Sequence, residues 1–378
     1  MTKKINYNEQ CITFSQMNMI SNSRLFWRRF TTWIRVYIIS RYVGIGTEEE
    51  AFSRLYFETS GIGNFVQIIF ERESSNMISQ QFNQFTFALR DLITAQRQGN
   101  TEAMIQNVDR LYKSADDFAT LLSSINPYIK ETEWRNMLET YVRYTIEEAN
   151  SFITGDYSND IGLFRHLTDL TNRMGDSFAQ ALNDYITSGY DLSPQSGLEC
   201  ITYEQMSQIY DIKMFLYEQA IWTRAYMISR YKGIGNTDEV KAYLDQIHIE
   251  YINVLQQLFG EDLETYLQLL NNYNNLLDQL ITAQIEGNVD EVNRIVQLLY
   301  QNADQRASVI ASLNPHWDEK EWKTRLYNNL NSTIDESTTF LTGDYTRNLD
   351  IFRTLLDQAE NASGYLARGL FNYLIDQQ

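Results

Sequence analysis

The sequence predicts an all-α protein made of two tandem up-and-down helical bundles, with about five long helices per copy. Three observations predict this architecture: only 3 prolines in 378 residues, apolar residues at helical spacing, and an internal repeat that spans the chain. Proline breaks helices, so its scarcity permits long helices throughout. The hydrophobic content of 43% is enough for sizeable cores and excludes a disordered chain.

The internal repeat consists of motifs that occur twice in the same order. The segment Cys11–Met17 returns as Cys200–Met206, and Ile39–Gly46 returns as Ile228–Gly235. Further pairs are Leu92–Gln96 with Leu280–Gln284, Asn126-Pro127 with Asn314-Pro315, and Thr154–Tyr157 with Thr342–Tyr345. The first pairs are 189 residues apart and the later ones 188, so one single-residue indel separates the copies. A match of this extent indicates a duplication.

The repeat also predicts the domain organisation. We expect an N-terminal segment at 1–23, copy one at 24–187, a linker at 188–212 and copy two at 213–378. The boundary between the copies lies in the polar stretch 188–197, which contains glycine, serine and proline.

Apolar spacing and turn residues predict the helices of copy one. Leu111, Ala115, Phe118 and Leu122 recur at the spacing of one helical face, and runs with strand-like alternation are absent. Glycine and asparagine mark the ends of the helices, as in Gly99-Asn100. The expected long helices are 22–42, 75–98, 101–124, 131–153 and 158–186, with shorter helical pieces in 48–70.

The net charge of −18 bears on the partners of the chain. Nucleic-acid binding and attraction to anionic membranes both depend on Lys and Arg, so the sequence predicts neither partner. No apolar run approaches the ~20 residues that span a bilayer. Residues 1–10 lack the apolar core of a Sec signal peptide. The default expectation is a cytoplasmic protein, and a spore or cell surface stays open as an alternative.

Several motifs of copy two resemble those of a known family. They are Glu218–Arg224, Asn302–Asp304, Ala311–Trp317 and Gly343–Tyr345. The chain resembles a poorly characterised helical-bundle family of spore-forming Gram-positive bacteria, whose members are usually single modules and are sometimes labelled acetylglutamate kinase. The resemblance covers both copies, and it implies a helical-bundle fold without a defined activity.

This chain departs from the family pattern at four positions. The pattern has histidine where this chain has Thr31 and Ala220, and again where it has Tyr141 and Asn329. If family members hold a ligand through those imidazoles, this chain has lost the ligating groups. The kinase label is also unsuitable, because glycine pairs such as Gly44-Ile-Gly46 follow helices rather than strands.

The sequence offers no convincing metal site, nucleophile or cofactor site. Asp245-x-x-His248 places two ligands on one helical face, but a di-iron site needs a second such set. The other histidines, His166 and His316, are unrelated to it by the repeat. Cys11 and Cys200 have no neighbouring base, so we expect packed thiols, with a pairing or redox role as the alternative. We therefore predict no metal, no cofactor and no catalytic residue.

Charged residues that occur in both copies are the remaining candidates for a site. We expect Arg35 and Arg224 to lie on inward faces, where an unpaired guanidinium would be costly. Structural ion pairs are the favoured interpretation, and a site for a small polar ligand is the alternative. The carboxylates involved are Asp116 and Asp304 as favoured partners, and Glu148 and Glu336 as second choice.

The leading functional hypothesis is a non-enzymatic structural or protein-interaction protein that assembles with itself or with a protein partner. The chain has 25 tyrosines and many Asn and Gln side chains, which suit polar interfaces. The alternative is a ligand-binding module with a pocket inside each bundle, and a remnant enzyme is the third hypothesis.

Overall fold

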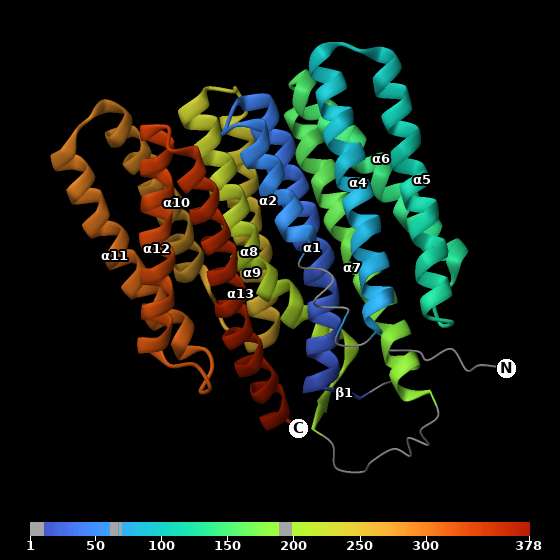
Figure 1. The fold of residues 1–378 in the computed structure, drawn as a ribbon. Coiled ribbons are helices and arrows are strands. Elements are labelled where there is room, and N and C mark those ends of the chain that lie inside the picture. Colours follow the sequence, from blue (N-terminus) through green and yellow to red (C-terminus); the bar gives the residue numbers. More distant parts are fainter. Residues whose placement is uncertain (1–10, 61–66, 68–69, 189–198) are drawn as a thin grey trace. The chain divides into compact units, whose positions relative to one another are not determined.

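The computed structural model describes residues 11–60, 67, 70–188 and 199–378, and it confirms the all-α fold class. Long helices lie side by side and are joined by short turns at their ends (Figure 1). The chain divides into two compact units. The copy-one unit is Ser15–Gly197, and the copy-two unit combines Met1–Phe14 with Leu198–Gln378.

The copy-one unit is an antiparallel bundle of successive helices. Neighbours in sequence pack together, with α4 on α5, α5 on α6 and α6 on α7, while α2 packs on α4. Helix α1 contributes a cluster of aromatic rings, in which Trp27 contacts Phe82, Phe118 and Trp134. The helices are α1 (Phe14–Val43), α2 (Glu48–Ser60), α4 (Arg72–Gln98), α5 (Thr101–Ile125), α6 (Glu131–Thr154) and α7 (Tyr157–Thr187).

The predicted turn residues end and begin these helices. Gly99 follows α4 with a φ of 66°, a left-handed conformation that glycine adopts without a steric penalty. Asn100 then caps α5, because its side chain accepts a hydrogen bond from the backbone of Ala103. The prediction of five long helices is therefore confirmed for copy one, with ends shifted by a few residues except at α1.

The copy-two unit repeats this order of helices and adds a short ribbon. Helix α8 packs on α9 and α13, and the remaining helices follow in sequence order. A core cluster between α10, α11 and α12 includes Leu277, Leu280 and Leu299. The elements are β1 (Ile12–Thr13), β2 (Cys200–Ile201), α8 (Tyr203–Lys232), α9 (Thr237–Phe259), α10 (Glu264–Glu286), α11 (Val289–Ser312), α12 (Glu319–Thr342) and α13 (Tyr345–Asp376).

The structure differs from the sequence predictions in three respects. Helix α9 is continuous over 23 residues, so copy two has six long helices rather than five. Helices α1 and α8 begin at Phe14 and Tyr203, so helix occupies part of the expected N-terminal segment 1–23 and linker 188–212. The proposed boundary stretch lies almost wholly in 189–198, outside the described residues. Across the part of the chain that is described, no helix combines the length and apolar character needed to cross a bilayer.

The ribbon is the third difference, because no strand was predicted. Strands β1 and β2 are antiparallel, with Ile12 opposite Ile201 and Thr13 opposite Cys200. Two residues per strand are too few to leave an alternating pattern in the sequence. Cys11 and Cys200 form a disulfide with their Cα atoms 5.1 Å apart, so the expectation of packed thiols is wrong and the pairing alternative holds.

Candidate functional site

The duplicated arginine of copy one lies in a buried cluster with two carboxylates. Arg35 on α1 donates through Nη1 to Glu148 on α6. It also donates to both carboxylate oxygens of Asp160 on α7, at 2.9 Å from Nη1 and 2.7 Å from Nη2. All three side chains are buried, and the guanidinium lies 4.9 Å from the ring centre of Phe164. The predicted ion pair of Arg35 is confirmed, although Asp160 was not foreseen.

Copy two repeats this cluster with one carboxylate fewer. Arg224 Nη1 donates to Glu336 Oε1 at 2.5 Å and to Asn348 Oδ1 at 2.7 Å. Asn348 occupies the position equivalent to Asp160, and its amide donates to Thr339 Oγ1 at 2.9 Å. The cluster in copy two therefore has one cation and one carboxylate, whereas copy one has one cation and two carboxylates.

The favoured partners, Asp116 and Asp304, do not reach these arginines. Asp116 is about half exposed and lies 3.2 Å from Arg135 Nε, and Asp304 lies 2.7 Å from Lys323 Nζ. The preceding residue of α5, Ala115, is on the buried face, and the next residue of a helix is rotated by about 100°. The prediction of these two partners is wrong because helical rotation turns both side chains toward solvent.

Burial sets the protonation of the two clusters. It raises the pKa of Glu148 to about 7, and the charge of Asp160 adds to this effect while Arg35 opposes it. Burial also raises the pKa of Glu336 against the effect of Arg224. The ion pairs of each cluster join neighbouring helices, while Glu148 Oε2, Arg224 Nη2 and Glu336 Oε2 are buried without a hydrogen-bond partner. None of the six duplicated residues lines the two cavities described next. The ligand-site interpretation of these six residues remains a hypothesis without support from the cavities.

Each unit has a small cavity between its helices that is partly open to solvent, and the two cavities lie at repeat-equivalent positions. The copy-one cavity is enclosed by α1, α4, α5 and α6, and the copy-two cavity by α8, α10, α11, α12 and α13. Seven lining positions correspond: Trp27 and Leu216, Phe30 and Gln219, Phe82 and Leu270, Phe85 and Tyr273, Phe118 and Arg306, Leu138 and Leu326, and Tyr141 and Asn329.

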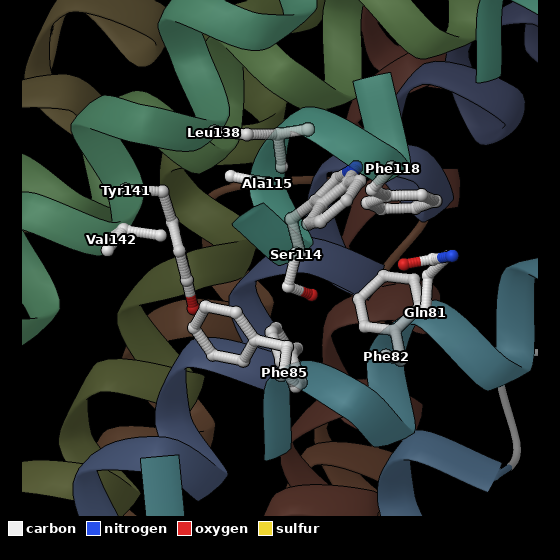
Figure 2. A pocket seen from close by; sticks show the side chains of 11 residues that line it. Gln81, Phe82, Phe85, Ser114, Ala115, Phe118, Leu138, Tyr141 and Val142 are labelled. Carbon is white, nitrogen blue, oxygen red and sulfur yellow. The ribbon is translucent and has the colours of Figure 1, made fainter. Parts of the chain in front are cut away.

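The copy-one cavity is mainly aromatic and has a volume of about 20 Å³. Figure 2 shows the Ser114 hydroxyl pointing inward among the rings of Phe82, Phe85 and Phe118. Tyr141 lines the same space, and its hydroxyl lies 2.8 Å from Thr31 Oγ1. Thr31 on α1 and Tyr141 on α6 therefore touch in copy one. Among the residues that the structure describes, none of those lining this cavity is charged.

The copy-two cavity is larger and more polar, with a volume of about 50 Å³. Gln219, Arg306 and Asn329 replace three aromatic side chains of copy one. Four buried polar atoms of its lining have no hydrogen-bond partner: Arg306 Nε, Arg325 Nε, Trp322 Nε1 and Gln358 Oε1.

Arg306 is the most unusual of these lining residues. Its side chain is 8% exposed, and its guanidinium lies 4.4 Å from the ring centre of Tyr273. No carboxylate among the described residues forms an ion pair with it, and burial lowers its pKa. The sequence analysis missed this residue. The sequence could have pointed to Arg306, because copy one has Phe118 at the equivalent position.

The histidine and the tyrosines around Arg306 are neutral. Burial lowers the pKa of His248 to about 4, and its ring nitrogens lie 2.9 Å from Asn271 Oδ1 and 2.8 Å from Gln219 Oε1. Burial raises the pKa values of Tyr266 and Tyr273. These groups therefore supply no negative charge at neutral pH. Among the described residues, no group of three or more His, Cys, Asp and Glu side chains is placed to hold a metal.

Comparisons of the chain with family models, with curated proteins and with solved structures give no match. Two of the motifs on which the family resemblance rests contribute to the local structure of this fold. Asn302 on α11 donates to the backbone oxygen of Leu269 at 2.9 Å, and Gly343 forms the turn between α12 and α13. These two motifs account for local structure.

Proposed function

We propose that this chain is a non-enzymatic binding protein that holds a small polar molecule inside the copy-two unit. The observation that carries the proposal is the polar lining of the copy-two cavity, where the buried cation Arg306 lies beside four polar atoms without hydrogen-bond partners. The copy-one lining has two such atoms, Trp27 Nε1 and Gln81 Oε1. Buried polar atoms of native proteins are nearly always hydrogen bonded, and those that face a cavity bond to water or to a ligand. Three of the four atoms are donors, so a ligand with several acceptor atoms suits this lining.

The size of the cavity supports binding in copy two rather than in copy one. A cavity needs on the order of 10–15 Å³ to accept one water molecule. The volume of about 50 Å³ in copy two therefore suits several non-hydrogen atoms, and about 20 Å³ in copy one suits only one. The aromatic rings of copy one fill the space that the shorter or polar side chains of copy two leave open.

The lining chemistry supports binding without catalysis. General acid–base and nucleophilic catalysis use His, Asp, Glu, Ser, Cys or Lys at the reacting atoms. The described residues that line the copy-two cavity are apolar, aromatic, amide and arginine side chains. These groups hydrogen bond to a ligand and enclose it, and they do not exchange protons readily at neutral pH.

Native mass spectrometry of the purified full-length chain tests the proposal. We expect an adduct of a small molecule at a ratio of one per chain, released on denaturation. The double variant Gln219→Phe and Asn329→Tyr carries the copy-one residues and should lose the adduct. The matched control Phe118→Leu, in the copy-one cavity, should keep it. A parent chain without adduct, and without binding in a screen of small polar molecules, would refute the proposal.

A further inference from the structure

We propose that the copy-two cavity binds a small organic acid, with Arg306 as the partner of its carboxylate. This inference rests on the proposed binding function and specifies its ligand class. Four other buried arginines among the described residues form ion pairs with carboxylates. They are Arg24 with Asp176, Arg35 with Glu148 and Asp160, Arg41 with Glu48, and Arg224 with Glu336. Arg306 is buried to the same degree without such a partner.

The charge balance of the cavity favours an anion. Arg306 and Arg325 are the charged side chains among the described lining residues. Arg325 already has an ion pair with Glu321, at 2.6 Å from Nη2 to Oε1. His248 and the nearby tyrosines are neutral, so one positive charge stays uncompensated. A buried cation without a counter-charge is costly, and a bound anion would remove that cost.

The amount of charge and the shape of the donors favour a monocarboxylate. One uncompensated guanidinium balances one negative charge, whereas a phosphate carries more. The planar fork of a guanidinium fits the two oxygens of a carboxylate. Tyr273 stacks on Arg306 and fixes its plane. Leu270, Ala359 and Ala362 add an apolar wall against which a short hydrocarbon part of the acid can pack.

The copy-one cavity provides an internal comparison. Its residue at the position of Arg306 is Phe118, and its described lining residues are uncharged. The pair of cavities thus differs in the one feature that recognises a carboxylate. We infer that the duplication has produced one unit with an anion site and one unit with a filled core.

Calorimetric titration of the full-length chain with matched acids and amides tests the inference. The probes are acetate and propionate, their uncharged amides, and inorganic phosphate. We expect at least one acid to bind about tenfold or more tightly than its amide, because a hydrogen bond to a charged group adds that much. Phosphate should bind more weakly than that acid.

Variants at the two equivalent positions complete the test. Arg306→Met should lose the preference for the acid, and Phe118→Met should keep it. Equal binding of acid and amide by the parent chain would overturn the carboxylate inference while leaving the binding function intact. Phosphate binding tighter than any acid would also overturn it. Absence of binding by every probe, together with no adduct in native mass spectrometry, would refute the proposed function itself. If Arg306→Met does not fold, the ratio of the parent chain's affinities for an acid and for its amide still tests the carboxylate inference.

Discussion

Trp317 packs its indole directly against the backbone of Gly369, so that a Cβ at position 369 would lie 2.5 Å from Trp317 Cδ1. Trp317 follows Asn314-Pro315 at the start of the α11–α12 turn, and Gly369 lies in α13. The equivalent pair in copy one is Ile129 and Ala181, both buried. At this contact, copy two therefore combines a larger side chain, Trp317, with no side chain at Gly369, whereas copy one combines the smaller Ile129 with Ala181.

This contact predicts that Gly369→Ala destabilises the copy-two unit. Overpacking of a filled core typically costs about 1–3 kcal/mol. Thermal unfolding followed by tryptophan fluorescence should show a lower melting temperature. The double variant with Trp317→Ile copies the copy-one pair and should recover part of the loss. A single variant as stable as the parent would show that the indole can move aside.

The Arg35 cluster, with its two carboxylates, predicts that the stability of the chain depends on pH. The variant Asp160→Asn should weaken this dependence. The pKa of Glu148 is raised in the folded state, so the folded chain binds more protons than the unfolded chain between about pH 4.5 and 7. The stability due to this group is full at low pH and is lost as pH rises through that window. In Asp160→Asn, one carboxylate faces Arg35, and the loss should become smaller.

Urea unfolding at pH 5, 6 and 7 measures this effect. The reciprocal variant Asn348→Asp gives copy two the composition of copy one, so it should make stability fall more steeply as pH rises. Identical pH dependence in the parent and in Asp160→Asn would contradict the role assigned to the second carboxylate.

The disulfide between Cys11 and Cys200 predicts sensitivity to reductant. The bond joins residues 189 apart in sequence, and cross-links over long loops restrict the unfolded chain. Removing it by Cys11→Ser with Cys200→Ser should cost about 2–4 kcal/mol of unfolding free energy. Reductant should destabilise the parent to the same extent and leave the double variant unchanged. A parent chain that melts at the same temperature with and without reductant would contradict this prediction.

Self-association, the leading hypothesis from the sequence, has its own test. A net charge of −18 opposes association, and physiological salt screens that repulsion beyond ~8 Å. Association should therefore strengthen as salt rises from low to physiological concentration, as measured by light scattering at several protein concentrations. A monomer of 44.4 kDa under all these conditions would exclude self-assembly, and the ligand proposal would be unaffected.

The sequence predicted the ends of the helices, but it did not predict which side chains the packing of the helices brings together. Helix ends followed from residues such as Gly99 and Gly155, whose conformation depends on their own backbone. Joint duplication identified Arg35 and Glu148 as candidates, but it equally identified Asp116, the favoured partner, which lies beside Arg135 instead. Asp160 joins them only because of the rotation of α7, which the sequence does not specify. Arg306 lies at a duplicated position where the residue type differs, with Phe118 in copy one, so a search for residues shared by both copies did not find it.

The disulfide beside the ribbon determines whether cleavage of one peptide bond separates the chain into two fragments. With the bond closed, residues 11 to 200 form a covalent ring that contains all the helices of copy one. A protease that cuts once within this ring opens it but releases no fragment, so the mass in non-reducing gels stays at that of the intact chain. Reduction after the cut would separate two pieces. After one cleavage between residues 11 and 200, the two fragments therefore stay covalently joined by the disulfide.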